Sequence, residues 1–137
     1  MPDTLKLEIV TPEAQTYSDD VEMVTLPGIE GEMGVYPKHV PLMTQLTAGE
    51  IIVRKDGQDL FLAVGEGFVE ITGDHVAVLT DMAIKADDID EAKAEEARRR
   101  AEARLAENLN DADNAIVSAA LANALAQIHV KRRRQNR

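Results

Sequence analysis

The chain has no cysteine and no tryptophan, and aromatic residues make up only 3% of its 137 residues. Without cysteine there can be no disulfide, no thiol nucleophile and no cysteine-ligated zinc, which fits a reducing compartment. A buried core must therefore be largely aliphatic. No apolar run approaches the ~20 residues of a membrane-spanning helix, and the first residues lack a signal-peptide pattern, so we expect a soluble protein that stays where it is made.

The sequence also lacks catalytic and metal-binding patterns. The three histidines, His39, His75 and His129, are far apart, and none has the spacing of metal ligands, so we expect no metal site. The glycines of the turn-rich segment described below do not lead into a helix start, which disfavours a phosphate-binding loop. These patterns favour a structural or interaction subunit over an enzyme.

The net charge of −10 is unevenly distributed. Residues 1–85 carry 15 acidic and 5 basic residues, whereas residues 113–137 carry 1 and 5. Four of the C-terminal bases are consecutive and form what we call the basic tip: Lys131, Arg132, Arg133 and Arg134. Such a tip is either a solvated tail or a docking element for an acidic partner. The acidic remainder and the scarcity of aromatic residues disfavour nucleic-acid binding.

Short strands joined by glycine and proline turns dominate residues 1–85. Residues 26–50 hold three of the five prolines and four of the eight glycines, which predicts tight turns, with one corner formed by Gly31, Glu32, Met33 and Gly34. Alternating apolar and polar residues predict strands at 5–10 and 21–26, and later turns predict two hairpins. Eight or more such strands predict an antiparallel β-sandwich or small barrel as a first domain, residues 1–85.

The composition of the sequence changes at residue 86. Residues 89–109 are rich in alanine and contain no glycine or proline, which predicts a helix capped by Asp88. A polar break precedes a second alanine-rich helix, from 115 to about 130, and the two predict an antiparallel hairpin over residues 86–137. Because alanine buries little apolar area, at about 0.8 kcal/mol per methylene, we expect weak docking and a hairpin that can rearrange. The alternative is a hairpin that stays in one place.

Several segments resemble the epsilon subunit of bacterial F-type ATP synthase. The most specific is LPGIEGEMGVYPKHVPLMT at 26–44, and GEGFVE at 65–70, VAVLTDMA at 76–83 and DIDEAKAEEA at 88–97 agree with it. The resemblance implies an α+β protein: an antiparallel β-sandwich of about ten strands followed by an antiparallel two-helix hairpin. It also implies a non-catalytic central-stalk subunit that binds the gamma subunit and the c-ring and helps couple proton flow to ATP synthesis. Its place would be peripheral, at the cytoplasmic face of the bacterial inner membrane.

The resemblance also assigns roles to residues. Eight of them would form the sandwich end that faces the c-ring loops: Gly31, Glu32, Met33, Gly34, Pro37, His39, Pro41 and Leu42. Glu32 is the leading candidate for a polar contact there, and the alternative is an acid merely exposed on a turn. The hairpin would hinder ATP hydrolysis when extended along gamma, with the basic tip contacting the beta (and alpha) subunits. Arginines 98, 99, 100 and 104 compete for that role unless they pair with glutamates on their own helix.

Some members of that family bind ATP at the hairpin through an Ile/Leu-Asp-x-x-Arg-Ala motif. Ile89, Asp90 and Ala94 match it, Lys93 replaces the arginine, and Arg100 is a further candidate. Because lysine cannot make the planar two-pronged contact of arginine, we expect at most weak ATP binding. The alternative to the stalk subunit is a free-standing adaptor whose hairpin grips another helical partner.

Overall fold

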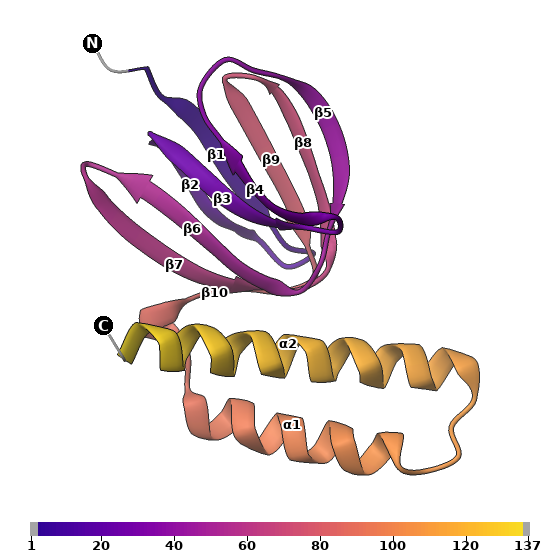
Figure 1. Ribbon diagram of the computed structural model, residues 1–137. Helices are drawn as coiled ribbons and strands as arrows, with labels where there is room; N and C mark the ends of the chain where they lie inside the picture. The colour runs from indigo at the N-terminus through magenta and orange to yellow at the C-terminus, as the bar shows by residue number, and fades with distance from the viewer. Residues whose placement is uncertain (1–2, 136–137) are drawn as a thin grey trace.

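The computed structural model describes residues 3–135, with side chains described as far as Arg133. Ten strands form a β-sandwich, and two antiparallel α-helices lie against one side of it, so the predicted fold class is confirmed (Figure 1). In chain order the elements are β1 (Leu5–Val10), β2 (Gln15–Val21), β3 (Met23–Gly28), β4 (Gly31–Val35), β5 (His39–Leu46), β6 (Gly49–Lys55), β7 (Gln58–Val64), β8 (Gly67–Gly73), β9 (His75–Thr80), β10 (Ala83–Lys85), η1 (Ala86–Asp88), α1 (Glu91–Leu105) and α2 (Asp111–Gln135).

The strands form one continuous sheet that folds over into two layers (Figure 1). Their order is β10-β7-β6-β3-β5-β8-β9-β1-β2, and β4 pairs with β3. The sheet bends where β3 meets β5, since only Gly28 and Leu46 are paired there. All neighbours are antiparallel except β1 and β9, which run parallel. This parallel pair joins distant parts of the chain, and no local turn in the sequence announces it.

Two local expectations were wrong. The corner predicted at residues 31–34 is part of β4, and the turn lies at Ile29 and Glu30 instead. Gly31 closes that turn with a φ of 130°, a conformation that side-chain-bearing residues rarely adopt. The strand predicted at 21–26 is the junction of two, because β2 ends at Val21 and β3 begins at Met23.

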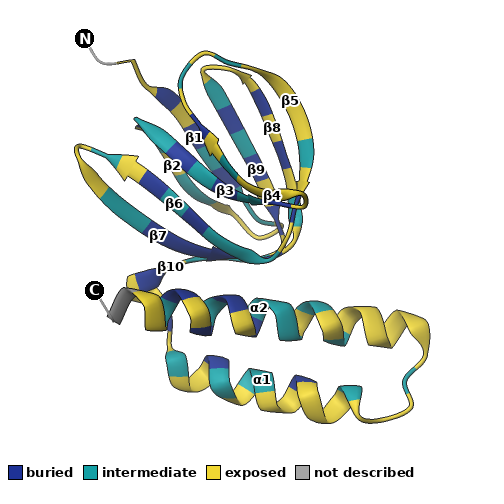
Figure 2. Ribbon diagram, viewed as in Figure 1, coloured by how far each residue is buried: buried dark blue, intermediate teal, exposed yellow. Residues whose placement is uncertain are grey.

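The main core lies between the two layers, and its buried members are all aliphatic. Its fully buried members alternate along the strands, as Leu5, Leu7 and Ile9 do in β1 (Figure 2). Leu62 and Val64 of β7 belong to this core. Their neighbours Phe61 and Ala63 are also buried, although they point to the other side of the strand. Strand β7 is therefore covered on both faces.

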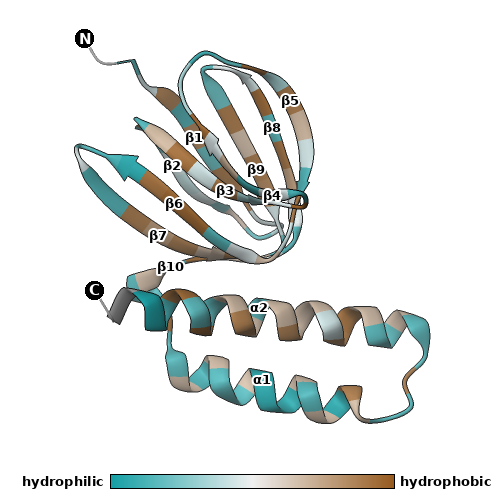
Figure 3. Cartoon of the chain, in the orientation of Figure 1, coloured by the Kyte–Doolittle hydropathy of each residue, from teal (hydrophilic) through white to brown (hydrophobic). Residues whose placement is uncertain are grey.

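The second cover of β7 is the C-terminal half of α2. Val130, Ala126 and Ile89 join Phe61 and Ala63 in a separate buried cluster. The N-terminal half of α2 extends past this contact (Figure 1). Ile116 in that half is exposed. Figure 3 shows that α1 is hydrophilic along most of its length. Helix α1 packs against α2 and not against the sandwich. The hairpin is thus held to the sandwich mainly through one half of one helix.

Both helices begin at a side-chain cap. Asp90 accepts a hydrogen bond of 3.1 Å from the Lys93 amide and caps α1, so the predicted cap at Asp88 was wrong by two residues. Asp88 lies in η1. Asn110 accepts a hydrogen bond of 2.8 Å from the Asp113 amide, which explains why α2 begins four residues before the predicted start.

Charged side chains fasten β6 to the edge strand β2 across the layers. Lys55 of β6 forms an ion pair with Asp19 of β2, and its hydrogen bond holds the pKa of Asp19 below the usual value. The Lys85 ammonium lies 5.9 Å from the centre of the Tyr17 ring on β2, and burial raises the pKa of that tyrosine. The Lys55–Asp19 pair therefore links β6 to β2 without the hairpin, and the Lys85–Tyr17 contact is a separate link between β10 and β2.

The two cores predict two kinds of destabilisation. Leu62→Ala leaves a cavity in the main core and should lower the free energy of unfolding by about 2–5 kcal/mol. Val130→Ala should cost about 2 kcal/mol, all of it in docking of the hairpin. Amide hydrogen exchange checks this: Leu62→Ala accelerates exchange in every strand, whereas Val130→Ala accelerates it only in α1 and α2. Equal acceleration of the β1 and β9 amides by Val130→Ala would show that the two cores unfold together.

Candidate functional site

The basic tip is engaged by this chain's own acceptors. The Lys131 ammonium donates to the Ala86 carbonyl oxygen at 3.2 Å. Arg132 contacts two glutamates of α1, with its Nη2 2.7 Å from Glu95 and its Nε 3.5 Å from Glu91. Arg133 Nη1 lies 2.5 Å from Glu50 Oε1 on β6. The Arg134 side chain lies outside the described residues. In this conformation the three described side chains of the tip are therefore bonded within the chain, although those of Arg132 and Arg133 stay partly exposed.

The side chains of the acids that hold the tip are partly withdrawn from water, to different degrees. The Glu50 side chain is only 8% exposed, and its second oxygen has no hydrogen-bond partner within the described residues. One oxygen of Glu91 is in the same condition. Glu95 also accepts from Arg98 at 2.7 Å, and this hydrogen bond, helped by the charge of Arg132, lowers the pKa of Glu95. The three carboxylates depend on arginines for their charge compensation.

The structure separates the eight residues that were predicted to form one end of the sandwich. Gly31 lies opposite Gly28, at the same end as the close of β5. His39 lies opposite Gly73, at the end where β8 and β9 turn. Strand β4 spans the distance between them, about 16 Å for five residues. The grouping into one end was therefore wrong: Gly31 and Glu32 lie at one end, Met33 and Gly34 lie along β4, and Pro37, His39, Pro41 and Leu42 belong to the opposite loop and the start of β5.

The two ends differ in how their polar groups are used. Glu32 is exposed in the β3–β4 hairpin, opposite Pro27. At the other end, the Lys38 amide donates to Asp74 at 2.8 Å and its ammonium lies 3.3 Å from Asp3. His39 Nδ1 donates to the Val40 carbonyl oxygen at 2.6 Å. The loop end is internally bonded, whereas Glu32 is presented outward.

The residues that match the ATP-binding motif lie at the start of α1, and they have structural roles there. Ile89 and Ala94 are buried, and the Asp90 carboxylate caps the helix. Arg100 lies ten residues further on, about 15 Å along the helix axis, and is paired loosely with Glu96 at 3.9 Å. Lys93 contributes its amide to the cap. Weak ATP binding stays a prediction.

The arginines of α1 pair mainly with nearby glutamates. Arg98 contacts Glu95 and Glu102, each at 2.7 Å. Arg104 lies 2.6 Å from Glu107, three residues further along the chain. These contacts match the i,i+3 and i,i+4 spacing that stabilises helices. They favour an internal role for these arginines over partner binding.

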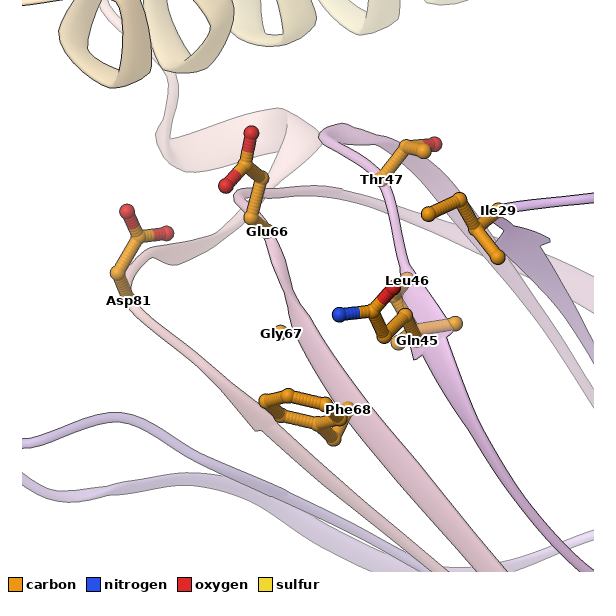
Figure 4. Close-up of a pocket in the computed structure, with 8 residues that line it drawn as sticks. All are labelled: Ile29, Gln45, Leu46, Thr47, Glu66, Gly67, Phe68 and Asp81. Atoms are coloured by element: carbon orange, nitrogen blue, oxygen red, sulfur yellow. The ribbon is translucent and has the colours of Figure 1, made fainter. Parts of the chain in front are cut away.

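Sequence reasoning missed an apolar surface on the outer face of β5, β8 and β9. Phe68 of β8 and Leu79 of β9 lie opposite each other and are 51% and 53% exposed, and Met43 of β5 is 65% exposed. Open hollows of about 440 Å³ and 360 Å³ flank this ridge, and Glu66 and Asp81 line both. Figure 4 shows the first hollow, with both carboxylates at its helix-facing side and the Phe68 ring at its other side.

A sequence signal for this surface did exist. Phe68 and Leu79 stand next to the buried Val69 and Val78, at positions where a half-buried strand should present polar residues. Two large apolar residues out of phase in neighbouring strands indicate a face that something else covers.

Other kinds of site are not found in the part of the chain that the structure covers. No group of three or more His, Asp and Glu side chains among residues 3–133 could hold a metal ion. None of the described helices is long and apolar enough to cross a membrane. The basic tip and the apolar face are therefore the features that a function has to explain.

Comparison with known proteins connects the sandwich and the hairpin to one family. The family model for the ATP synthase delta/epsilon chain β-sandwich domain matches residues 4–86, and that for the long α-helix domain matches residues 87–132. The ATP synthase epsilon chain of Laribacter hongkongensis (strain HLHK9) is 42% identical over 127 residues, which are 91% of this chain and 91% of that one.

Solved structures agree on the fold. A chain in the cryo-EM structure of Euglena gracilis mitochondrial ATP synthase (OSCP/F1/c-ring) matches 92% of this chain with a TM-score of 0.74 and 23% identity, over 80% of its own length. One from the central stalk and c-ring of Tetrahymena thermophila mitochondrial ATP synthase matches 64% of this chain, with a TM-score of 0.54 and 12% identity, over 70% of its own length. On the strength of the two family models and the bacterial relative, this chain belongs to the ATP synthase delta/epsilon family.

Proposed function

We propose that this chain is a rotor component of a bacterial F-type ATP synthase. It is a non-catalytic epsilon subunit that fastens the gamma subunit to the c-ring, peripheral to the cytoplasmic face of the inner membrane, while protons drive ATP synthesis. The family match over residues 4–132 supports this proposal, since it includes both the sandwich and the hairpin in the expected order. The observation that carries it is the uncovered apolar face.

The apolar face is the surface for the gamma subunit. Soluble monomers seldom leave large side chains grouped on an open sheet unless a partner covers them. Phe68, Leu79 and Met43 provide a hydrophobic centre, and Glu66 and Asp81 provide an acidic rim beside the two hollows. A shaft segment with apolar side chains and a flanking lysine or arginine fits this arrangement.

The Glu32 end is the surface for the c-ring. Glu32 presents its carboxylate on a short hairpin, whereas the polar groups of the Lys38–His39 loop are bonded within the chain. Polar loops of a ring subunit can therefore find an unsatisfied partner at Glu32. The opposite loop, whose polar groups are bonded within the chain, could contribute mainly steric fit to such a contact.

The hairpin is the regulatory part. The structure shows it docked on β6 and β7, and the inhibitory form is one in which it leaves this position and extends along gamma. The basic tip then meets an acidic surface on the beta subunit, as charge complementarity favours. A small docking cluster in which three of the six buried residues are alanines fits an element that has to detach.

A free-standing adaptor remains the second candidate. In that case the apolar face binds some other helical protein. Affinity purification of the chain from its native cells distinguishes the two: recovery of gamma and c-ring subunits supports the rotor, and their absence from the purified material supports the adaptor.

Phe68→Asp tests the gamma surface. Placing a charge at the centre of the apolar face should weaken binding to purified gamma by about thirtyfold, or about 2 kcal/mol, which is typical of a central interface anchor. Ile116→Asp is the matched control, since Ile116 is 67% exposed on the hairpin, away from this face. Calorimetry measures both affinities, and thermal unfolding confirms that each variant is folded. Equal affinities of the Phe68→Asp and Ile116→Asp variants for gamma would show that gamma does not bind the apolar face.

Crosslinking tests the end that faces the ring. Because the chain has no cysteine, Glu32→Cys and His39→Cys each introduce a single thiol. In the assembled complex with a cysteine in the polar loop of the c subunit, Glu32→Cys should form a disulfide with the ring and His39→Cys should not. The reverse result would show that the end with His39, and not the end with Glu32, faces the c-ring.

Removal of residues 86–137 tests the division between the two parts. The sandwich should still assemble with gamma and the c-ring, while ATP hydrolysis by the complex rises several-fold because the inhibitory element is gone. Replacement of the basic tip by alanines in the full chain should give the same rise. Loss of assembly on truncation would show that the hairpin is required for binding, and an unchanged rate in the alanine variant would exclude the tip from inhibition.

A further inference from the structure

Consecutive residues of the basic tip form ion pairs at two different contacts, which we call joints: one between the hairpin and the sandwich, and one between α1 and α2. Arg133 pairs with Glu50 of β6, and this is the one ion pair between hairpin and sandwich among the described side chains. Arg132 pairs with Glu91 and Glu95 of α1, so it joins the two helices to each other. One joint has to open for the hairpin to leave the sandwich, and the other has to open for the helices to separate.

The two partners of the Arg133–Glu50 pair differ in burial, so removing one or the other has a different effect on docking. The Glu50 side chain contacts Arg133 of the docked helix and is only 8% exposed, and one of its oxygens has no partner within the described region, whereas the Arg133 side chain is 41% exposed. Docking therefore withdraws a carboxylate from water, and Arg133 compensates for it. If Arg133 is removed, a nearly buried charge stays uncompensated, which is strongly unfavourable. If Glu50 is neutralised, the attraction and the desolvation penalty disappear together.

We propose that Glu50, Glu91 and Glu95 form an internal acidic site that competes with the external partner for the basic tip, and so sets how readily the hairpin is released. The external half of this competition rests on the proposed inhibitory function, and the internal half does not. The same guanidinium groups cannot occupy both sites, because Arg132 and Arg133 are already within 2.7 Å of their internal carboxylates. Each internal pair therefore weakens inhibition by holding back the group that inhibits.

Distance measurements on the isolated full chain test the internal half. Spin labels on Gln58→Cys and Ser118→Cys report the separation of sandwich and α2, and labels on Ala103→Cys and Ser118→Cys report that of the two helices; all three positions are exposed and the chain has no other cysteine. Arg133→Gln should raise the ratio of undocked to docked molecules about tenfold or more, as expected for an unpaired and nearly buried carboxylate. Lys6→Gln is the control for net charge, because it removes one positive charge from an exposed side chain beside the β8–β9 turn, at the end of the sandwich opposite the hairpin (Figure 1).

The double variant provides the sharper outcome. Glu50→Gln alone should change the undocked ratio by less than about threefold, and adding it to Arg133→Gln should return the ratio to within about threefold of the parent. Arg132→Gln should broaden the distribution of distances between the two helices and leave that between the sandwich and α2 unchanged. The proposal is overturned if Arg133→Gln behaves like Lys6→Gln, or if Glu50→Gln adds to its effect.

Hydrolysis by the assembled complex tests the competition. Glu91→Gln combined with Glu95→Gln keeps the basic tip and removes its internal partners, so hydrolysis should fall, in the opposite direction to the rise that alanines at the tip produce. A rise in hydrolysis with these acid variants would overturn the competition. If hydrolysis responds to neither set while the labelled variants behave as expected, the inhibitory function is wrong and the two joints stand.

Discussion

The packing of α2 on the outer side of β7 joins the two parts of the molecule, and the other arrangements depend on it. Strand β7 sends Leu62 and Val64 into the sandwich and Phe61 and Ala63 toward the helix. A strand that is apolar on both faces needs a second cover. The sequence therefore requires the hairpin to be somewhere near β7 in the unassembled chain, and any extended form has to expose or re-cover Phe61.

The sandwich has two outer faces with different occupants. The face of β6 and β7 is covered by the chain's own α2, while the face of β5, β8 and β9 carries exposed Phe68 and Leu79. The two faces meet at Asp81, which lines both hollows beside Phe68 and accepts a long hydrogen bond of 3.4 Å from Asn123 of α2. Gly65 leaves room for this contact, since a Cβ there would lie 1.8 Å from the Asp81 carboxylate. A partner at the apolar face is therefore adjacent to the point where the helix touches the sandwich.

The sequence predicted what depends on neighbours along the chain. The alternation of Leu5, Leu7 and Ile9 gives a strand because side chains alternate across a sheet, and the hairpin turns contain Gly57 and Gly73 at φ values of 75° and 56°. Pattern and composition likewise indicated the two alanine-rich helices. The predicted helix starts shifted by a few residues because several polar residues in a row can act as caps, and only the geometry selects Asp90 and Asn110.

What the sequence did not predict depends on pairs distant in the chain. Arg133 and Glu50 are 83 residues apart, and nothing local marks Glu50 as the acid that the helix will bury. The parallel pairing of β1 with β9 and the exposure of the Phe68 face arise in the same way, from the order in which strands assemble into layers. The motif that resembles the family correctly gave the fold. It also grouped Gly31 with His39, because proximity in sequence hides the length of β4 between them.

The combination of an alanine-rich seam with buried charge gives the ion pairs an influence that surface pairs usually lack. An exposed pair contributes about 0–1 kcal/mol, which a well-packed leucine interface would render unimportant. Here the docking cluster is small and Glu50 is nearly buried, so the presence or absence of one guanidinium changes the balance by a large fraction of the total. Reversing a two-state population from 1:99 to 99:1 takes about 5.5 kcal/mol. Exchange of a few charge-assisted contacts on the tip for equivalent contacts on a partner is of that order, which places control of the hairpin in charge exchange more than in apolar packing.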